Sequence, residues 1–209
     1  MMKFKVKFGT EWRFSRLIYL PLVMIITNGC AEFQFHENLK SQLSDKAIWV
    51  EPPYVHQEDE KSCGLAVIAM LTQFYKKPIT ELQRQVLIAE SGRLGGIKGA
   101  TLVETLKNAG YFATLFPGTI EIGITSLYEN LNHGRPLIVM LEMGESQPIA
   151  GKQQFINHHY VLVTGYDPAT NKIVLYDPAQ GKEIVKASDF SARWERDNRF
   201  TILAIPEGT

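Results

Sequence analysis

The chain has 209 residues, of which 45% are hydrophobic and 21% are charged. That profile is typical of one globular domain with a short appendage, and it supplies enough apolar residues to bury a core. The formal net charge is zero, which gives no reason to expect nucleic acid as a partner, and the two cysteines allow at most one disulfide.

Residues 1–29 have the pattern of an export signal. Basic residues precede Leu17, and the apolar run from Leu17 to Ile26 is about ten residues long, too short for a bilayer core that needs ~20. The next four residues, Thr-Asn-Gly-Cys ending at Cys30, resemble the lipobox of bacterial lipoproteins, whose cysteine is acylated. We therefore expect an exported lipoprotein that faces the periplasm or the cell exterior and is held on the membrane by a lipid on Cys30. A plain secretory signal or a membrane anchor is the alternative.

Lipidation of Cys30 leaves Cys63 as the only free thiol, which excludes a disulfide and favours a reactive role for Cys63. Residues 30–46 are polar and mixed, so we predict a tether there. The folded domain is predicted to span residues 47–209, and it begins with a short strand at 47–50.

The stretch from Gln57 to Gly64 leads into a strongly apolar segment. We predict a helix from Cys63 to about Tyr75, with Ser62 as its N-cap, buried because it is apolar on nearly every face. Helix N-termini carry partial positive charge, which favours a thiolate and makes a cysteine there reactive. The acidic residues between Gln57 and Lys61 are interpreted as a solvated rim, and a lone buried cysteine is usually only a small hydrophobic residue.

The following segments alternate between helix and strand signals. A capping-box pattern at Thr80 opens a helix to about Glu90, and a second one at Thr101 follows a glycine-rich loop at 91–99. Further elements are predicted as a helix at 101–108, a strand at 111–116, a helix from about 126 to 132 and a strand at 136–141. Residues 144–157 form a long polar loop of the kind that is often functional.

A strand apolar on both faces is predicted at 159–166, followed by a turn and a second strand at 172–176. Because the turn is short, the two strands should pair antiparallel, which brings His159 at one strand's start beside Asp177 after the other's end. A strand at 182–185, a helix at 188–194 and a strand at 200–205 complete the chain.

These placements predict a nucleophile, a base and an orienting carboxylate, the arrangement of acyl-transfer catalysis. Cys63 is the candidate nucleophile, His159 the base and Asp177 its orienter, while a side-chain N–H of Gln57 is placed to stabilise charge on a substrate carbonyl. His158 is the alternative base, although strand alternation sends it to the opposite face from His159. Asp177 is alternatively a turn residue that caps its own backbone, and Gln57 a solvated loop residue.

The same residues carry a family resemblance. Gln57, then Cys63-Gly64 at the start of an apolar helix, then the strand beginning His159-Tyr160 and the dipeptide Asp177-Pro178 resemble the C39-like cysteine peptidases of the papain-like superfamily. The resemblance covers nearly the whole domain. It implies an α+β papain-like fold, in which an N-terminal helical half packs on an antiparallel β-sheet half.

The resemblance implies hydrolysis of a peptide bond by Cys63, His159 and Asp177, with Gln57 as oxyanion donor. Well-known family members are fused to peptide-exporting transporters and remove leaders after a double glycine, whereas here an export signal is predicted. Alternatives are an amidase or acyltransferase acting on cell-wall or other amides, or an inactive peptide-binding domain. We expect a peptide or protein substrate and no cofactor. No metal site is predicted, because the histidines lack ligand spacing.

Overall fold

The computed structural model describes residues 38–121, 123, 125–143 and 158–208. The chain divides into two compact units, residues 1–40 and 41–209, and every helix and strand named below belongs to the second unit. The predicted export signal, Cys30 and the loop predicted at 144–157 lie outside the described residues. Across the described part of the chain, no helix combines the length and apolarity that crossing a membrane requires.

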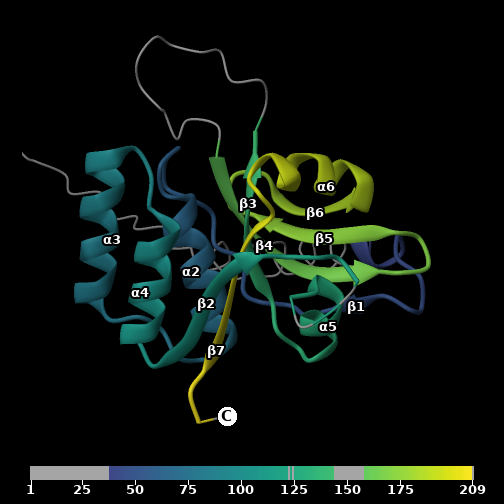
Figure 1. The fold of residues 1–209 in the computed structure, drawn as a ribbon, viewed down its shortest axis with the longest axis horizontal. Coiled ribbons are helices and arrows are strands. Elements are labelled where there is room, and N and C mark those ends of the chain that lie inside the picture. Colours follow the sequence, from purple (N-terminus) through teal and green to yellow (C-terminus); the bar gives the residue numbers. More distant parts are fainter. Residues whose placement is uncertain (1–37, 122, 124, 144–157, 209) are drawn as a thin grey trace, which may run out of the picture. The chain divides into compact units, whose positions relative to one another are not determined.

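A seven-stranded antiparallel sheet forms the centre of the second unit (Figure 1). Six strands follow the order β2-β7-β3-β4-β5-β6, and the short β1 pairs with β4. The strands are β1 (Ile48–Trp49), β2 (Tyr111–Pro117), β3 (Leu137–Glu142), β4 (His158–Asp167), β5 (Lys172–Asp177), β6 (Gly181–Lys186) and β7 (Phe200–Pro206). The sequence therefore predicted the strands with only small errors at their ends.

The predicted pairing of β4 with β5 is confirmed. The strands run antiparallel, with Leu162 opposite Tyr176, and the register shifts between Val163 and Gly165. Beside this irregularity β1 passes so close that a Cβ atom on Gly165 would lie 2.7 Å from the carbonyl oxygen of Ile48. Glycine at this position therefore lets β1 join the sheet.

Helices cover both faces of the sheet (Figure 1). They are α2 (Cys63–Phe74), α3 (Glu81–Leu94), α4 (Gly99–Asn108), α5 (Leu127–Asn132) and α6 (Ala187–Arg196). Tyr160 and Leu162 of β4 point into the core formed with α2, α3 and α4, and Val161 and Val163 point into the core formed with α5 and α6. This alternation confirms the helical half packed on an antiparallel sheet, and it adds a second helical layer that we did not predict.

The prediction that α2 is buried is confirmed. Val67, Ile68, Met70 and Leu71 are all 0% exposed. These side chains pack against the sheet and the neighbouring helices, whereas a single stripe of α2, formed by the partly exposed Leu65 and Ala69 and the exposed Gln73, reaches the surface. The helix that begins at Cys63 is thus held rigidly by its own packing.

Two boundaries differ from the prediction. The capping box between Thr80 and Gln83 is present, but α3 continues to Leu94 and ends at Gly95, whose φ of 78° is left-handed. The predicted capping box at Thr101 is wrong, because α4 begins two residues earlier and the Thr101 hydroxyl donates instead to Glu90 at 2.9 Å. A tertiary contact between α3 and α4 thus overrides a local capping pattern.

The start of the compact unit lies before the predicted domain boundary at residue 47. The unit begins at Ser41, and Ser44 donates both its backbone N–H and its hydroxyl to the carboxylate of Asp167, each at 2.7 Å. Part of the segment that we predicted as a tether at 30–46 is therefore bonded to the turn between β4 and β5.

Candidate active site

Cys63 is the first residue of α2, and it is buried, with 7% of its surface exposed. Its sulfur is a free thiol. Ser62 occupies the N-cap position of α2, as predicted. Its hydroxyl, however, makes no hydrogen bond to the first turn of the helix. The thiol therefore faces the positive end of a rigid helix dipole.

His159 and Asp177 form a buried pair. The ring Nε2 of His159 lies 2.7 Å from Oδ1 of Asp177, and the two residues are 8% and 3% exposed. The antiparallel pairing of β4 with β5 brings them together, as the sequence predicted. Asp177 Oδ1 also accepts the backbone N–H groups of Ala179, at 2.7 Å, and Gln180, at 3.2 Å, so the oxygen that faces His159 is fixed by the turn after β5 as well.

Cys63 lies near enough to His159 to act on the pKa of its ring. Burial alone lowers the pKa of His159, but the hydrogen bonds with Asp177 and Cys63 outweigh burial and raise it to about 9. Burial likewise tends to raise the pKa of Asp177, and the hydrogen bond from His159 lowers it below its usual value. The arrangement therefore favours an imidazolium held between a carboxylate and a thiol sulfur.

Gln57 is bonded through its backbone to the turn that follows Asp177. Its N–H donates to the carbonyl of Pro178 at 3.0 Å, directly after Asp177. Its side-chain Nε2 donates to the carbonyl of Asp59 at 2.9 Å, which uses one of the two amide protons. Its Oε1 is buried and has no hydrogen-bond partner among the described residues. Gln57 is thus no freely solvated loop residue.

Tyr54 is a residue of this region that the sequence analysis missed. Its hydroxyl lies 3.0 Å from the carbonyl oxygen of Asp177 and 3.1 Å from that of Pro178. Burial, followed by the charge of Asp177, raises the pKa of Tyr54, so it remains a neutral donor. The sequence around Tyr54, directly after two prolines, did not indicate this contact, because the contact joins the segment before α2 to the turn after β5, which is far away in the sequence.

His158, the alternative base, has a different partner. Its Nδ1 lies 2.5 Å from Oδ1 of Asp197, which follows α6, and its side chain is 36% exposed. Burial raises the pKa of Asp197, although its contact with His158 acts in the opposite direction. The two adjacent histidines therefore point to different aspartates, in keeping with the alternation of a strand.

Glu183 on β6 is a second missed residue. It pairs in register with Leu175 of β5, two residues before Asp177. Burial and the nearby charge of Asp177 raise the pKa of Glu183, whereas Arg193 and His159 lower it. A second carboxyl group thus stands close to the His159–Asp177 pair. The sequence of β6 contains no pattern that would have identified Glu183 as a residue of the site.

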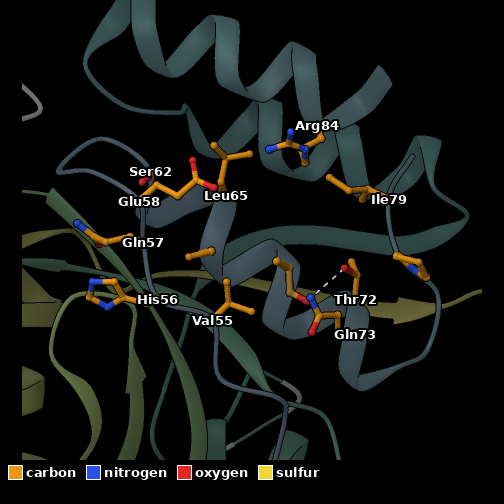
Figure 2. A pocket seen from close by; sticks show the side chains of 13 residues that line it. Val55, His56, Gln57, Glu58, Ser62, Leu65, Thr72, Gln73, Ile79 and Arg84 are labelled. Atoms are coloured by element: carbon orange, nitrogen blue, oxygen red, sulfur yellow. Dashed lines mark hydrogen bonds between the residues drawn. The ribbon is translucent and has the colours of Figure 1, made fainter. Parts of the chain in front are cut away.

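A pocket of about 280 Å³ lies between the loop at residues 55–62, which leads into α2, the helix α2 itself and the start of α3 (Figure 2). Its apolar lining comes from Val55, Leu65, Ala66, Ala69 and Ile79. Gln57 and Ser62 also line it, and the Gln57 side chain lies on the side of α2 opposite Ile79 and Arg84 (Figure 2). The described residues hold no group of three or more histidine, cysteine, aspartate or glutamate side chains that could bind a metal ion.

Comparison with known proteins identifies a family. The family described as "Peptidase_C39 like family" matches residues 50–202, which is most of the chain. The chain is 31% identical over 141 residues to the lactococcin-G-processing and transport ATP-binding protein LagD of Lactococcus lactis subsp. lactis. That match covers 67% of this chain and 17% of the relative, so the chain spans about a sixth of that protein's length.

Solved structures of low sequence identity share the fold. The peptidase domain of Streptococcus ComA has a TM-score of 0.54 at 18% identity, covering 75% of this chain and 100% of that domain. A structure from Bacillus anthracis described as a C39-like peptidase has a TM-score of 0.58 at 16% identity, covering 79% and 100%. A double glycine motif protease from an AMS/PCAT transporter, in complex with the leader peptide, has 0.53 at 18% identity, covering 76% and 94%. The α+β papain-like fold is thereby confirmed.

Proposed function

Because the chain belongs to the C39-like peptidase family, we propose that it is a cysteine peptidase in which Cys63, His159 and Asp177 hydrolyse a peptide bond and Gln57 stabilises the oxyanion. The observation that carries this proposal is the buried His159–Asp177 pair, joined at 2.7 Å, with Cys63 near enough to raise the pKa of the same imidazole. Three residues from α2, β4 and β5 take the roles of nucleophile, base and orienter.

In the proposed acylation step, the Cys63 thiolate attacks the carbonyl carbon of the scissile amide and an Sγ–C bond forms. The carbonyl π electrons move onto oxygen, and the resulting oxyanion accepts hydrogen bonds from the Cys63 backbone N–H and from Gln57 Nε2. His159 then gives its proton to the amide nitrogen, the C–N bond breaks, and an amine leaves. A thioester remains on Cys63, and Asp177 keeps the ring in place throughout.

In the deacylation step, the now neutral His159 takes a proton from a water molecule, and the oxygen of that water attacks the thioester carbonyl. A second oxyanion forms in the same place. When it collapses, the Sγ–C bond breaks and a carboxylic acid is released. The Cys63 thiolate and the His159 imidazolium are restored, and the raised pKa of His159 favours its protonated ring.

The substrate class follows from the relatives. The Lactococcus relative is named for processing lactococcin G, and one solved relative contains a leader peptide. We propose a peptide or protein substrate for this chain on that basis. Since the chain spans only 17% of the Lactococcus protein, no transport function is carried over. From the pattern of residues 1–30 we further propose export and a lipid anchor on Cys30.

The direct test replaces the nucleophile. Cys63→Ala should abolish cleavage in a peptide library read by mass spectrometry, because no other described thiol can form the thioester. His159→Ala should reduce cleavage by several orders of magnitude, whereas His158→Ala, a matched imidazole one residue away, should retain it. Thermal unfolding of each variant serves as the control for folding.

Two outcomes would overturn the proposal. Undiminished cleavage by Cys63→Ala would remove cysteine chemistry altogether. Alkylation of wild-type Cys63 by iodoacetamide at the rate of a free thiol at the same pH, together with no cleaved peptide, would instead indicate a domain that binds peptides without cutting them.

A further inference from the structure

The hydroxyl of Ser62 bonds to both backbone groups of a single residue. Its Oγ accepts the N–H of Asp59 at 2.9 Å and donates to the carbonyl of Asp59 at 2.9 Å. The Ser62 backbone N–H reaches the same carbonyl at 3.3 Å. Ser62 is 6% exposed although Asp59 is exposed. A buried hydroxyl therefore holds the backbone N–H and the carbonyl of a surface residue.

The Asp59 carbonyl is also the group that holds the proposed oxyanion donor. It accepts one of the two Nε2 protons of Gln57 at 2.9 Å. Because an amide NH₂ group is planar, fixing one N–H by a hydrogen bond also sets the direction of the other. The loop around Asp59 is braced further, since its carboxylate accepts the N–H of Lys61 at 2.8 Å and Ser91 donates to the Lys61 carbonyl at 2.7 Å.

We infer that Ser62 is a positioning residue for oxyanion stabilisation: through the Asp59 peptide group, its hydroxyl aims the second amide N–H of Gln57. The inference rests on the proposed function and deepens it. An oxyanion donor accelerates a reaction only when it is oriented before the charge develops. Ser62 and Gln57 also stand at the same end of the pocket, next to the start of α2 (Figure 2).

A role as an ordinary helix cap does not account for Ser62. A capping serine accepts the backbone N–H of the second or third helical residue, and Ser62 makes no such bond. Ser126 provides a matched comparison at the start of α5. It is fully buried, donates to Ile120 at 2.8 Å and accepts the N–H of Glu129 at 3.2 Å, so it does cap its helix.

The test uses two probes on the full chain that separate oxyanion formation from thiol reactivity. With p-nitrophenyl acetate, an Sγ–C bond forms on Cys63 through a tetrahedral oxyanion, the C–O bond breaks, and nitrophenolate leaves. With iodoacetamide, the thiolate displaces iodide and no oxyanion forms. A defect in positioning Gln57 slows the first reaction and spares the second, whereas a loss of thiolate or a disturbed Cys63 slows both.

We expect Gln57→Ala to lower the acylation rate constant about 100-fold and Ser62→Ala about tenfold, with alkylation within about twofold of wild type. The double variant Gln57→Ala/Ser62→Ala should be no slower than Gln57→Ala alone, because Ser62 acts through Gln57. Ser126→Ala should lower thermal stability and leave both rate constants unchanged.

Each other outcome overturns the inference. If Ser62→Ala acylates like wild type while Gln57→Ala is slow, Ser62 has no positioning role and the proposed function stands. If the two defects multiply in the double variant, Ser62 acts independently of Gln57. If Gln57→Ala has no effect, there is no donor for Ser62 to position. Acylation that persists in Cys63→Ala, by contrast, overturns the proposed function itself.

Discussion

The two neighbouring histidines at the start of β4 bind aspartates from different parts of the chain. His158 bonds to Asp197 after α6, and His159 bonds to Asp177 at the end of β5. Single-residue alternation along a strand separates them, which is why a one-residue shift in register would exchange an exposed imidazole for the one beside Cys63. At the residue scale, the site therefore depends on the register of β4.

Asp177→Asn tests the electrostatic part of this arrangement. The interactions of His159 with Asp177 and Cys63 together outweigh burial and raise the pKa of His159 to about 9, so a neutral amide in place of Asp177 should lower that pKa by about 1–2 pH units. His159 donates a proton to the leaving amine, so the basic limb of the kcat/KM profile should move to lower pH by the same amount. Ring-proton NMR titration of His159 provides an independent measurement.

The same pKa has a consequence for stability. A histidine whose pKa is higher in the folded state contributes stability that is fully present below the unfolded value of about 6.5 and is lost as pH rises through about 9. Asp177→Asn should remove much of this contribution, so its stability deficit should be larger at pH 6 than at pH 10. A deficit independent of pH, with an unmoved basic limb, would show that Asp177 does not set the protonation of His159.

At the scale of elements, the turn between β4 and β5 is tied to the start of the compact unit. Asp167 is fully buried and accepts from Ser44 N and Oγ and from Thr170 Oγ1, each at 2.7 Å, as well as from the backbone N–H of Ala169 at 3.0 Å. Burial alone raises the pKa of Asp167, but these hydrogen bonds outweigh it and hold the pKa well below the usual range. One carboxylate thus joins two segments far apart in the sequence.

Asp167→Asn should destabilise the protein by about 3 kcal/mol at pH 7, because several donors lose a charged acceptor. A carboxyl group with a lowered folded pKa contributes stability above its unfolded pKa and loses it as pH falls through the folded one. The difference between variant and wild type should therefore shrink in strong acid. Urea unfolding at several pH values measures it, with the exposed Asp45→Asn as control; equal stability of the two variants at pH 7 would contradict the prediction.

At the scale of the whole molecule, the candidate site draws on both parts of the papain-like fold. Cys63 comes from the helical layer, and His159 and Asp177 come from the sheet, which is covered by α5 and α6 on its far face. The backbone N–H of Gln57 donates to the carbonyl of Pro178 and so joins the loop before α2 to the turn after β5. The site is therefore intact only when the helical layer and the sheet are packed together.

The proposed lipid anchor on Cys30 has its own test. Cys30→Ser should abolish incorporation of a radiolabelled fatty acid and release the protein from the membrane pellet, because the proposed acyl chain is attached to that thiol. A plain secretory signal predicts a released and unlabelled wild type. A membrane anchor of another kind predicts that both proteins stay in the pellet without label.

The sequence by itself determined the elements and the candidate residues of the site. Apolar periodicity identified α2 as buried and β4 as central, and the short turn after Asp167 implied the antiparallel pair that brings His159 to Asp177. Local patterns were sufficient there, because strand alternation and hairpin geometry depend on near neighbours.

The tertiary structure alone decided the supporting contacts. The bond of Gln57 to Pro178, the bond of Ser44 to Asp167 and the Tyr54 contact with the turn after β5 all join segments that no local pattern relates. For Ser62 the local sequence favoured a helix cap, and the folded loop instead turned its hydroxyl toward Asp59. Hydrogen bonds of this kind depend on where the backbone lies after packing, and hydrophobic periodicity carries no information about that position.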